Sequence, residues 1–186
     1  VTITEDHFDP SLVRFTGTGL VSGWSHAGNI HTATVSFPEG VNTFGVTSSD
    51  QAGNESNAVN EPEFVVDTTK PELSIEGVTQ GAAYYQTPEI RLSYSDTNLD
   101  LGSLSVTLTG RKGTTFKVPV VNGHLDLSVI PNEAKSDDLY TMDAAVSDLA
   151  GNSNTAKVQF ILNRFGSTVD VEGTSYQGKY VKAPID

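Results

Sequence analysis

Two short motifs rich in oxygen-bearing side chains recur along the sequence. Ser49–Asn54 reads Ser-Asp-Gln-Ala-Gly-Asn, and Ser147–Asn152 reads Ser-Asp-Leu-Ala-Gly-Asn. An aspartate side chain accepts hydrogen bonds from backbone N–H groups two residues further on, and Gly and Asn tolerate a positive φ. The first interpretation is therefore structural, a tight turn that joins two strands. The residues expected to form these two turns are Asp50, Gly53, Asn54, Asp148, Gly151 and Asn152.

The second interpretation of the same side chains is a calcium site. Calcium takes six to eight oxygen ligands, and carboxylates and amide carbonyls are among those it prefers. Such a site requires that the fold gather acidic loops that are distant in sequence. The candidate ligands are Asp67, Asp96, Asp100, Asp148 and Asn152.

The sequence contains no pattern that indicates catalysis. There is no cysteine, and the four histidines lack the spacing of a zinc site. Gly23–Ala27 resembles the Gly-x-Ser-x-Gly nucleophile motif but ends in Ala instead of Gly. Gly110–Gly113 is too short for a phosphate-binding loop and is expected to be a hairpin turn. We expect no catalytic residue, and no cofactor other than calcium.

Trp24 is the only tryptophan of the chain, and Gly23, Ser25 and His26 flank it. One interpretation is an anchor in the core or in a loop. The other is a ligand-binding surface, in which Trp24 stacks on a sugar and His26 assists. The residues alone leave both open.

Composition limits the partners. Of 186 residues, 11 are Lys or Arg and 23 are Asp or Glu, which gives a net charge of −12. This charge repels phosphate backbones, so we expect no nucleic acid partner. No apolar stretch approaches the 18 to 20 residues of a membrane span, so we expect no membrane insertion. Val and Thr are abundant, which favours strands.

Alternation of apolar and polar residues predicts seven strands in the second half of the chain. A single helical turn is expected only between Pro131 and Asp138. The apolar series of the seven strands are Leu73–Ile75, Ile90–Tyr94, Leu104–Leu108, Phe116–Val120, Leu125–Val129, Tyr140–Val146 and Ala156–Leu162.

An internal repeat runs through the sequence. Thr4–Asp9 matches Ser95–Asp100, the Asp-x-Ala-Gly-Asn motifs match each other, and Glu63–Asp67 matches Gln159–Asn163. The blocks keep their order, with a spacing just under 100 residues. This predicts two copies of one domain, at residues 1–67 and 68–164, followed at 165–186 by a tail or the start of a further domain. Nothing in the first copy matches Pro71–Tyr85, so that copy is expected to lack its first strand.

Unit length and strand number fit an all-β fold of tandem immunoglobulin-like β-sandwiches, with about seven strands each. In such a sandwich, the loop between the second and third strands and the loop between the sixth and seventh lie at the end where the linker enters. That arrangement would bring the calcium candidates together at the domain junction and stiffen the array.

The repeated motifs, the Val66–Pro71 junction, Ser22–Phe37 and the strand that contains Tyr140 resemble bacterial Ig-like domain repeats. Such repeats occur in cell-surface and secreted proteins of Gram-positive bacteria. Phe44 is expected at the position of Tyr140, so a tyrosine corner is expected only in the second copy.

The resemblance implies an extracellular protein, secreted or attached to the cell wall. It also implies a non-catalytic structural or adhesive spacer that stacks Ig-like domains end to end, with the neighbouring domains of the same chain as partners. Two alternatives remain open: a module that binds carbohydrate or a host protein, and accessory domains of a secreted glycan-degrading enzyme.

Overall fold

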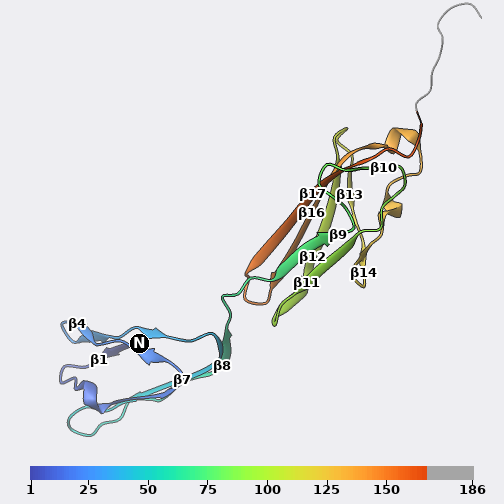
Figure 1. The fold of residues 1–186 in the computed structure, drawn as a ribbon. Helices are drawn as coiled ribbons and strands as arrows, with labels where there is room; N and C mark the ends of the chain where they lie inside the picture. The colour runs from blue at the N-terminus through green and yellow to red at the C-terminus, as the bar shows by residue number, and fades with distance from the viewer. Residues whose placement is uncertain (167–186) are drawn as a thin grey trace, which may run out of the picture. The chain divides into compact units, whose positions relative to one another are not determined.

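A computed structural model describes residues 1–166, and its fold is all-β, as predicted (Figure 1). The only helical elements in this range are short 3₁₀ turns at Pro10–Leu12, Leu127–Val129 and Ala134–Ser136. The last turn confirms the single helical turn expected between Pro131 and Asp138. The predicted tail or further domain at residues 165–186 lies outside the described residues from position 167 onward.

Eight strands form the N-terminal half of the described chain. They are β1 (Thr2–Thr4), β2 (Val13–Gly17), β3 (Leu20–Val21), β4 (Ser25–Ala27), β5 (Ile30–Thr32), β6 (Val35–Ser36), β7 (Gly40–Ser48) and β8 (Val59–Val66). They pair in three sheets, with the orders β1-β5-β4, β2-β7-β8 and β3-β6. Their pairings are antiparallel.

Nine strands form the C-terminal half. They are β9 (Glu72–Glu76), β10 (Ala83–Tyr84), β11 (Arg91–Ser95), β12 (Leu99–Gly110), β13 (Thr115–Lys117), β14 (Val120–Val121), β15 (His124–Leu125), β16 (Asp138–Asp148) and β17 (Ser153–Leu162). One sheet has the order β14-β15-β11-β9, and the other has the order β10-β17-β16-β12-β13. Two sheets of this size are compatible with a β-sandwich.

Strand pairing and packing divide the described chain differently. Strands within 2–66 pair only with one another, and so do strands within 72–162. Packing instead separates one unit (Val1–Ser74, Ser93–Ser105 and Ala144–Ala156) from a second that holds Ile75–Leu92, Val106–Asp143 and the chain from Lys157. This second division runs through β9, β11, β12, β16 and β17, each of which contributes residues to both units. Strand pairing breaks between Val66 and Glu72, whereas the packing division has no boundary there, so the predicted boundary at 67–68 stays a prediction.

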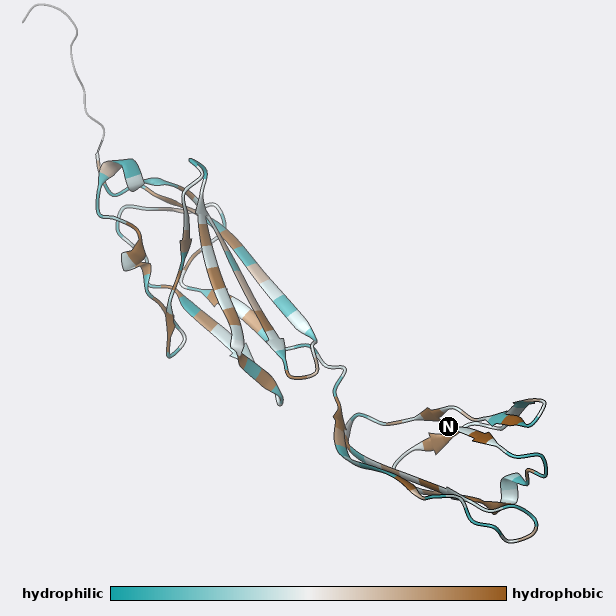
Figure 2. Ribbon diagram, turned by 180° about the vertical axis from the view of Figure 1, so that it is seen from behind, coloured by the Kyte–Doolittle hydropathy of each residue, from teal (hydrophilic) through white to brown (hydrophobic). Residues whose placement is uncertain are grey.

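The C-terminal half has a closed apolar core. In β16, Tyr140, Met142, Ala144 and Val146 are buried while the residues between them are partly exposed, as the predicted alternation requires. The same alternation appears as bands of brown along the long strands in Figure 2. Burying such side chains stabilises a fold by about 1.5–3 kcal/mol each. This core therefore supplies much of the stability of that half.

The core of the N-terminal half is more open. Ala33 is its only fully buried apolar side chain. Phe15, Trp24 and Phe44 are half-buried although their rings contact one another in series, with centroids 6.2 Å apart for Phe15–Trp24 and 6.0 Å for Phe15–Phe44. These aromatic rings keep part of their surface in water.

Two predicted strands differ from the structure. The series Phe116–Val120 is split between β13 and β14, which lie in different sheets. Pro119 stands at the break, because proline has no backbone N–H to donate to a ladder. The series Leu125–Val129 leaves the strand after Leu125 and becomes a 3₁₀ turn. There Asp126 caps the turn by accepting a hydrogen bond from the Ser128 N–H at 3.0 Å.

One strand was not predicted. Ala83 and Tyr84 form β10, which runs parallel to β17, with Ala83 opposite Ile161. The Tyr84 ring packs edge-on against Phe160, whereas Tyr85 is 78% exposed. With only two residues, β10 is too short to leave an alternation pattern in the sequence.

Candidate metal site

The two Asp-x-Ala-Gly-Asn motifs form turns with the same backbone hydrogen bonds. The Asp50 N–H donates to the Asn54 carbonyl at 3.0 Å, and the Gly53 N–H donates to the Asp50 carbonyl at 3.1 Å. The corresponding distances from Asp148 and Gly151 are 3.0 and 3.3 Å. Gly53 and Gly151 have φ values of +90° and +93°, a region that glycine enters without steric cost.

The aspartate side chains close both turns. Asp50 accepts from the Asn54 N–H at 2.8 Å and from its amide Nδ2 at 2.6 Å. Asp148 accepts from the same two groups of Asn152 at 2.9 and 2.8 Å. The Asn54 side chain, followed by its backbone N–H, lowers the pKa of Asp50. Each aspartate is thus fixed in place by the asparagine four residues further on.

Asp67, Asp96 and Asp148 are brought together in the structure. One carboxylate oxygen of each lies within 4.8 Å of the others. Asp67 follows β8, Asp96 follows β11, and Asp148 ends β16. Asp148 is only 3% exposed, and the other two are half-buried. Among residues 1–166, these three side chains form the only group of this kind.

Asn98 orients this acidic group, and sequence reasoning missed it. Its amide Nδ2 donates to Asp67 Oδ2 at 2.6 Å, and its backbone N–H donates to Asp96 Oδ1 at 2.7 Å. Its carbonyl accepts from the Leu149 N–H at 2.8 Å, next to Asp148. The spacing Asp96-Thr97-Asn98 is typical of a turn in which the aspartate side chain accepts a hydrogen bond from the backbone N–H two residues further on. This spacing is the sequence signal that indicates a role for Asn98.

The other two calcium candidates have different roles. Asn152 uses its amide Nδ2 to donate to the Asp67 carbonyl at 2.9 Å as well as to Asp148. Asp100 is not a member of the group of three, and its Oδ1 accepts from the Gly102 N–H at 2.9 Å. Three of the five predicted ligands therefore have carboxylates that lie close together. The Asn152 amide donates hydrogen bonds to two of these residues, to the Asp67 carbonyl and the Asp148 carboxylate.

One member of the group, Asp67, has a pKa below its ordinary value. Hydrogen bonds from the Asn98 side chain and then from the Thr69 N–H hold the pKa of Asp67 below its ordinary value. A carboxyl group with such a pKa is ionised at neutral pH. An anionic Asp67 close to two further acidic side chains suits a hard cation such as calcium, which prefers oxygen ligands.

Trp24 and His26 differ in their surroundings. The indole of Trp24 meets the Phe8 ring edge-on at 4.9 Å and stacks against Phe15. This is the arrangement expected of a core anchor. His26 is exposed in β4, and its ring lies 5.8 Å from that of His31, which stacks on Phe8 at 4.0 Å.

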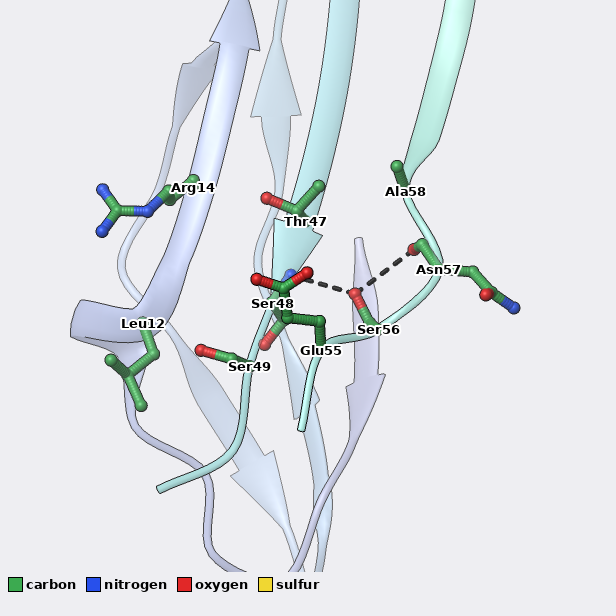
Figure 3. Close-up of a pocket in the computed structure, with 9 residues that line it drawn as sticks. All are labelled: Leu12, Arg14, Thr47, Ser48, Ser49, Glu55, Ser56, Asn57 and Ala58. Carbon is green, nitrogen blue, oxygen red and sulfur yellow. Dashed lines mark hydrogen bonds between the residues drawn. The ribbon is translucent and has the colours of Figure 1, made fainter. Parts of the chain in front are cut away.

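A polar hollow of about 530 Å³ lies near the β7–β8 hairpin (Figure 3). Arg14, Glu55 and several serines line it, but no histidine or aromatic side chain does. The Ser56 hydroxyl accepts from the Ser48 N–H at 3.0 Å and donates to the Asn57 carbonyl at 3.2 Å. The Ser56 hydroxyl is thus engaged by the backbone, and no histidine lines this hollow.

Searches against models of known protein families and against curated proteins find no match to this chain. Within the described part of the chain, no helix is both long enough and apolar enough to cross a membrane.

Proposed function

We propose that the chain is a non-catalytic structural spacer built from two copies of an immunoglobulin-like domain, within a large bacterial surface or secreted protein. In this role the domains hold other parts of the protein apart, and their turns and loops are available for adhesion. The observation that carries the proposal is that six of the eight N-terminal strands, all except the β3-β6 pair, have the same order as strands of the C-terminal half, and that both halves close the same turn with the same bonds.

The strand orders support two copies. In the N-terminal half, the sequence β2-β7-β8 corresponds to β12-β16-β17, and β1-β5-β4 corresponds to β11-β15-β14. These pairs follow the offsets of the sequence repeat. The C-terminal half adds β9 beside β11, β10 beside β17 and β13 beside β12. The N-terminal half has no counterpart of β9 or β10 within the described residues.

A second set of hydrogen bonds supports the same correspondence. The Tyr140 hydroxyl donates to the Ser136 carbonyl at 2.6 Å, the backbone contact that defines a tyrosine corner. The Asn42 amide Nδ2 donates to the Pro38 carbonyl at 2.9 Å, also four residues upstream. Asn42, and not Phe44, is thus the counterpart of Tyr140 when the two Asp-x-Ala-Gly-Asn turns are aligned.

The binding alternative has less support. A sugar-binding surface needs an aromatic face that is free to stack, and the Trp24 ring already packs against Phe8 and Phe15. A glycan-array screen in which Trp24→Ala abolishes a hit would nevertheless favour it over the spacer.

Small-angle X-ray scattering tests the spacer. A compact globule of 166 residues has a radius of gyration of about 15 Å. We expect a clearly larger value for residues 1–166, unchanged with protein concentration. A value near that of one globule would mean that the halves fold back on each other, and a spacer could not work in that way.

We further propose that Asp67, Asp96 and Asp148 bind calcium. Their three carboxylates supply part of the six to eight oxygens that the ion takes, and water or backbone carbonyls supply the rest. A ligand bound only to the folded state raises stability by mass action. We therefore expect a higher melting temperature in millimolar calcium than in a chelator.

Asp100→Asn is the matched control, because Asp100 lies near the start of β12, close to Asp96 in sequence but outside the group. Asp96→Asn is expected to remove the calcium-dependent rise, and Asp100→Asn to keep it. An equal melting temperature with calcium and with chelator in the unmodified chain would refute calcium binding.

A further inference from the structure

β1 and β8 are edge strands of the N-terminal half, and each has one side without a partner strand within residues 1–166. β1 pairs only with β5, and β8 pairs only with β7. An unpaired edge presents a row of free N–H and C=O groups to any extended segment that reaches it. In the corresponding places of the C-terminal half, β11 also pairs with β9, and β17 also pairs with β10.

The exposed fractions of equivalent side chains on β8 and β17 differ between the two halves. Phe160 and Leu162 on β17 are 0% and 1% exposed. Their counterparts on β8, Phe64 and Val66, are only half-buried, and Val65 between them is 52% exposed. Since the two strands share the same sequence pattern, the difference reflects what packs on them. Both phenylalanines have an aromatic neighbour, since the Tyr84 ring from β10 lies edge-on to Phe160 at 6.1 Å and the Phe37 ring lies edge-on to Phe64 at 4.9 Å. The difference is that β10 pairs with β17, whereas β8 has no second strand beside it within residues 1–166.

We propose that these edges and the open aromatic core form a β-strand addition site, and that its occupant is the polypeptide segment leading into Val1. The proposal rests on the two-copy architecture of the proposed function. Because Leu92 corresponds to Val1 in the repeat, the segment corresponds to Pro71–Arg91. It adds one strand beside β1 and a short one beside β8.

The chemistry of the occupant follows from β9. Leu73 and Ile75 alternate with polar residues and are half-buried, and Glu76 and Gly77 follow. The sequence repeats this pattern 96 positions later, where Val169 and Val171 alternate with polar residues before Glu172 and Gly173. Two alternating apolar residues followed by Glu-Gly are thus a recurring pattern of this sequence. A segment with the pattern of β9 is the occupant that the open edge fits.

The test adds a copy of Pro71–Arg91 directly before Val1. The control carries the same extension with serine at the two positions copied from Leu73 and Ile75, which removes the apolar side chains and keeps the length. Amide hydrogen exchange is measured over Thr2–Thr4 and Val59–Val66, and thermal unfolding is followed by Trp24 fluorescence.

We expect the extension to slow exchange in both strands by at least about tenfold. We also expect it to raise the Trp24 melting transition by at least about 5 °C over the control. Equal exchange and equal melting in the extension and its control would overturn the proposal. Slower exchange that appears only at high concentration, together with dimers in sedimentation, would also overturn it, because the occupant would then be a second copy.

If the extended chain does not fold, the same segment is supplied as a synthetic peptide to the unmodified chain. Saturable binding that depends on the two apolar residues supports the proposal, and no binding at millimolar peptide overturns it. The radius of gyration tests the spacer independently of the exchange and peptide-binding results. Failure of the strand-addition proposal can therefore be distinguished from failure of the spacer proposal.

Discussion

At the scale of single residues, aspartates act mainly as acceptors that close turns. Asp148 is buried and satisfies two groups of Asn152. Asp148→Ala removes the two carboxylate oxygens that accept hydrogen bonds from the backbone N–H and the side-chain amide of Asn152. We expect a loss of about 1–3 kcal/mol in the free energy of unfolding, measured by denaturant titration.

Asp50→Ala is the matched control for this prediction, because it breaks the same bonds in an exposed turn where water replaces the lost acceptor. It should destabilise the chain less than Asp148→Ala. Equal losses for the two variants would contradict the view that burial decides the effect.

A second residue-scale prediction concerns Asp137, which holds the end of β17 in place. Its carboxylate accepts from the Arg164 N–H at 2.6 Å, from Arg164 Nε at 3.0 Å and from the Phe165 N–H at 3.0 Å. Burial of Asp137 raises its pKa, but the hydrogen bonds from Phe165 and Arg164 outweigh burial and leave the pKa below its usual value. The native state therefore favours the ionised carboxylate.

The stabilisation from Asp137 should be complete above about pH 5 and should fall as the pH drops through and below 4, where the unfolded chain binds the proton first. Asp137→Asn should lower the melting temperature at pH 7, and the difference from the unmodified chain should shrink towards pH 3. A difference that stays constant with pH would show that the charge of Asp137 contributes nothing.

The members of the acidic group and the residues that orient them could be predicted from the sequence only in part. Asp67, Asp96 and Asp148 were predicted to meet because an immunoglobulin-like sandwich would place these three positions at one end of the domain. The spacing from Asp96 could have indicated the turn at Asn98, but the contact of the Asn98 amide with Asp67 could not be predicted, because a side-chain amide has many potential partners. Asn42 was missed because a buried asparagine leaves no trace in an apolar alternation pattern.

At the scale of elements, burial separates the strands of the two halves. Leu108 on β12 is 0% exposed, whereas Phe44 on β7 keeps part of its surface in water. We expect Leu108→Ala to cost about 2–5 kcal/mol, the usual range for a cavity in a closed core. Phe44→Ala should cost less than the 3–5 kcal/mol typical of a buried phenylalanine. Denaturant titrations of both variants measure this, and a larger loss for Phe44→Ala would contradict an open N-terminal core.

Alternation predicted the long strands well, because β12, β16 and β17 each bury one face and keep one parity over many residues. It failed where a single residue overrides the pattern. Pro119 interrupts the series Phe116–Val120, and Asp126 caps a turn where alternation predicted a strand. Two-residue strands such as β10 are fixed by long-range pairing, which a local pattern does not encode.

At the scale of the whole molecule, we propose that the two halves are copies of one sandwich that unfold as separate units and differ in completeness. The strand pairings place one set of strands within residues 2–66 and the other within 72–162. A chain of 65 residues extends to at most about 230 Å, and one of 91 residues to at most about 320 Å. The open core and unpaired edges of the N-terminal copy make it the weaker of the two.

Single-molecule force spectroscopy on the chain held at both ends tests this claim most directly. The account predicts two unfolding events, a shorter one of up to about 230 Å at low force and a longer one of up to about 320 Å at higher force. One cooperative event spanning the whole chain, or two events in the reverse order of force, would contradict it.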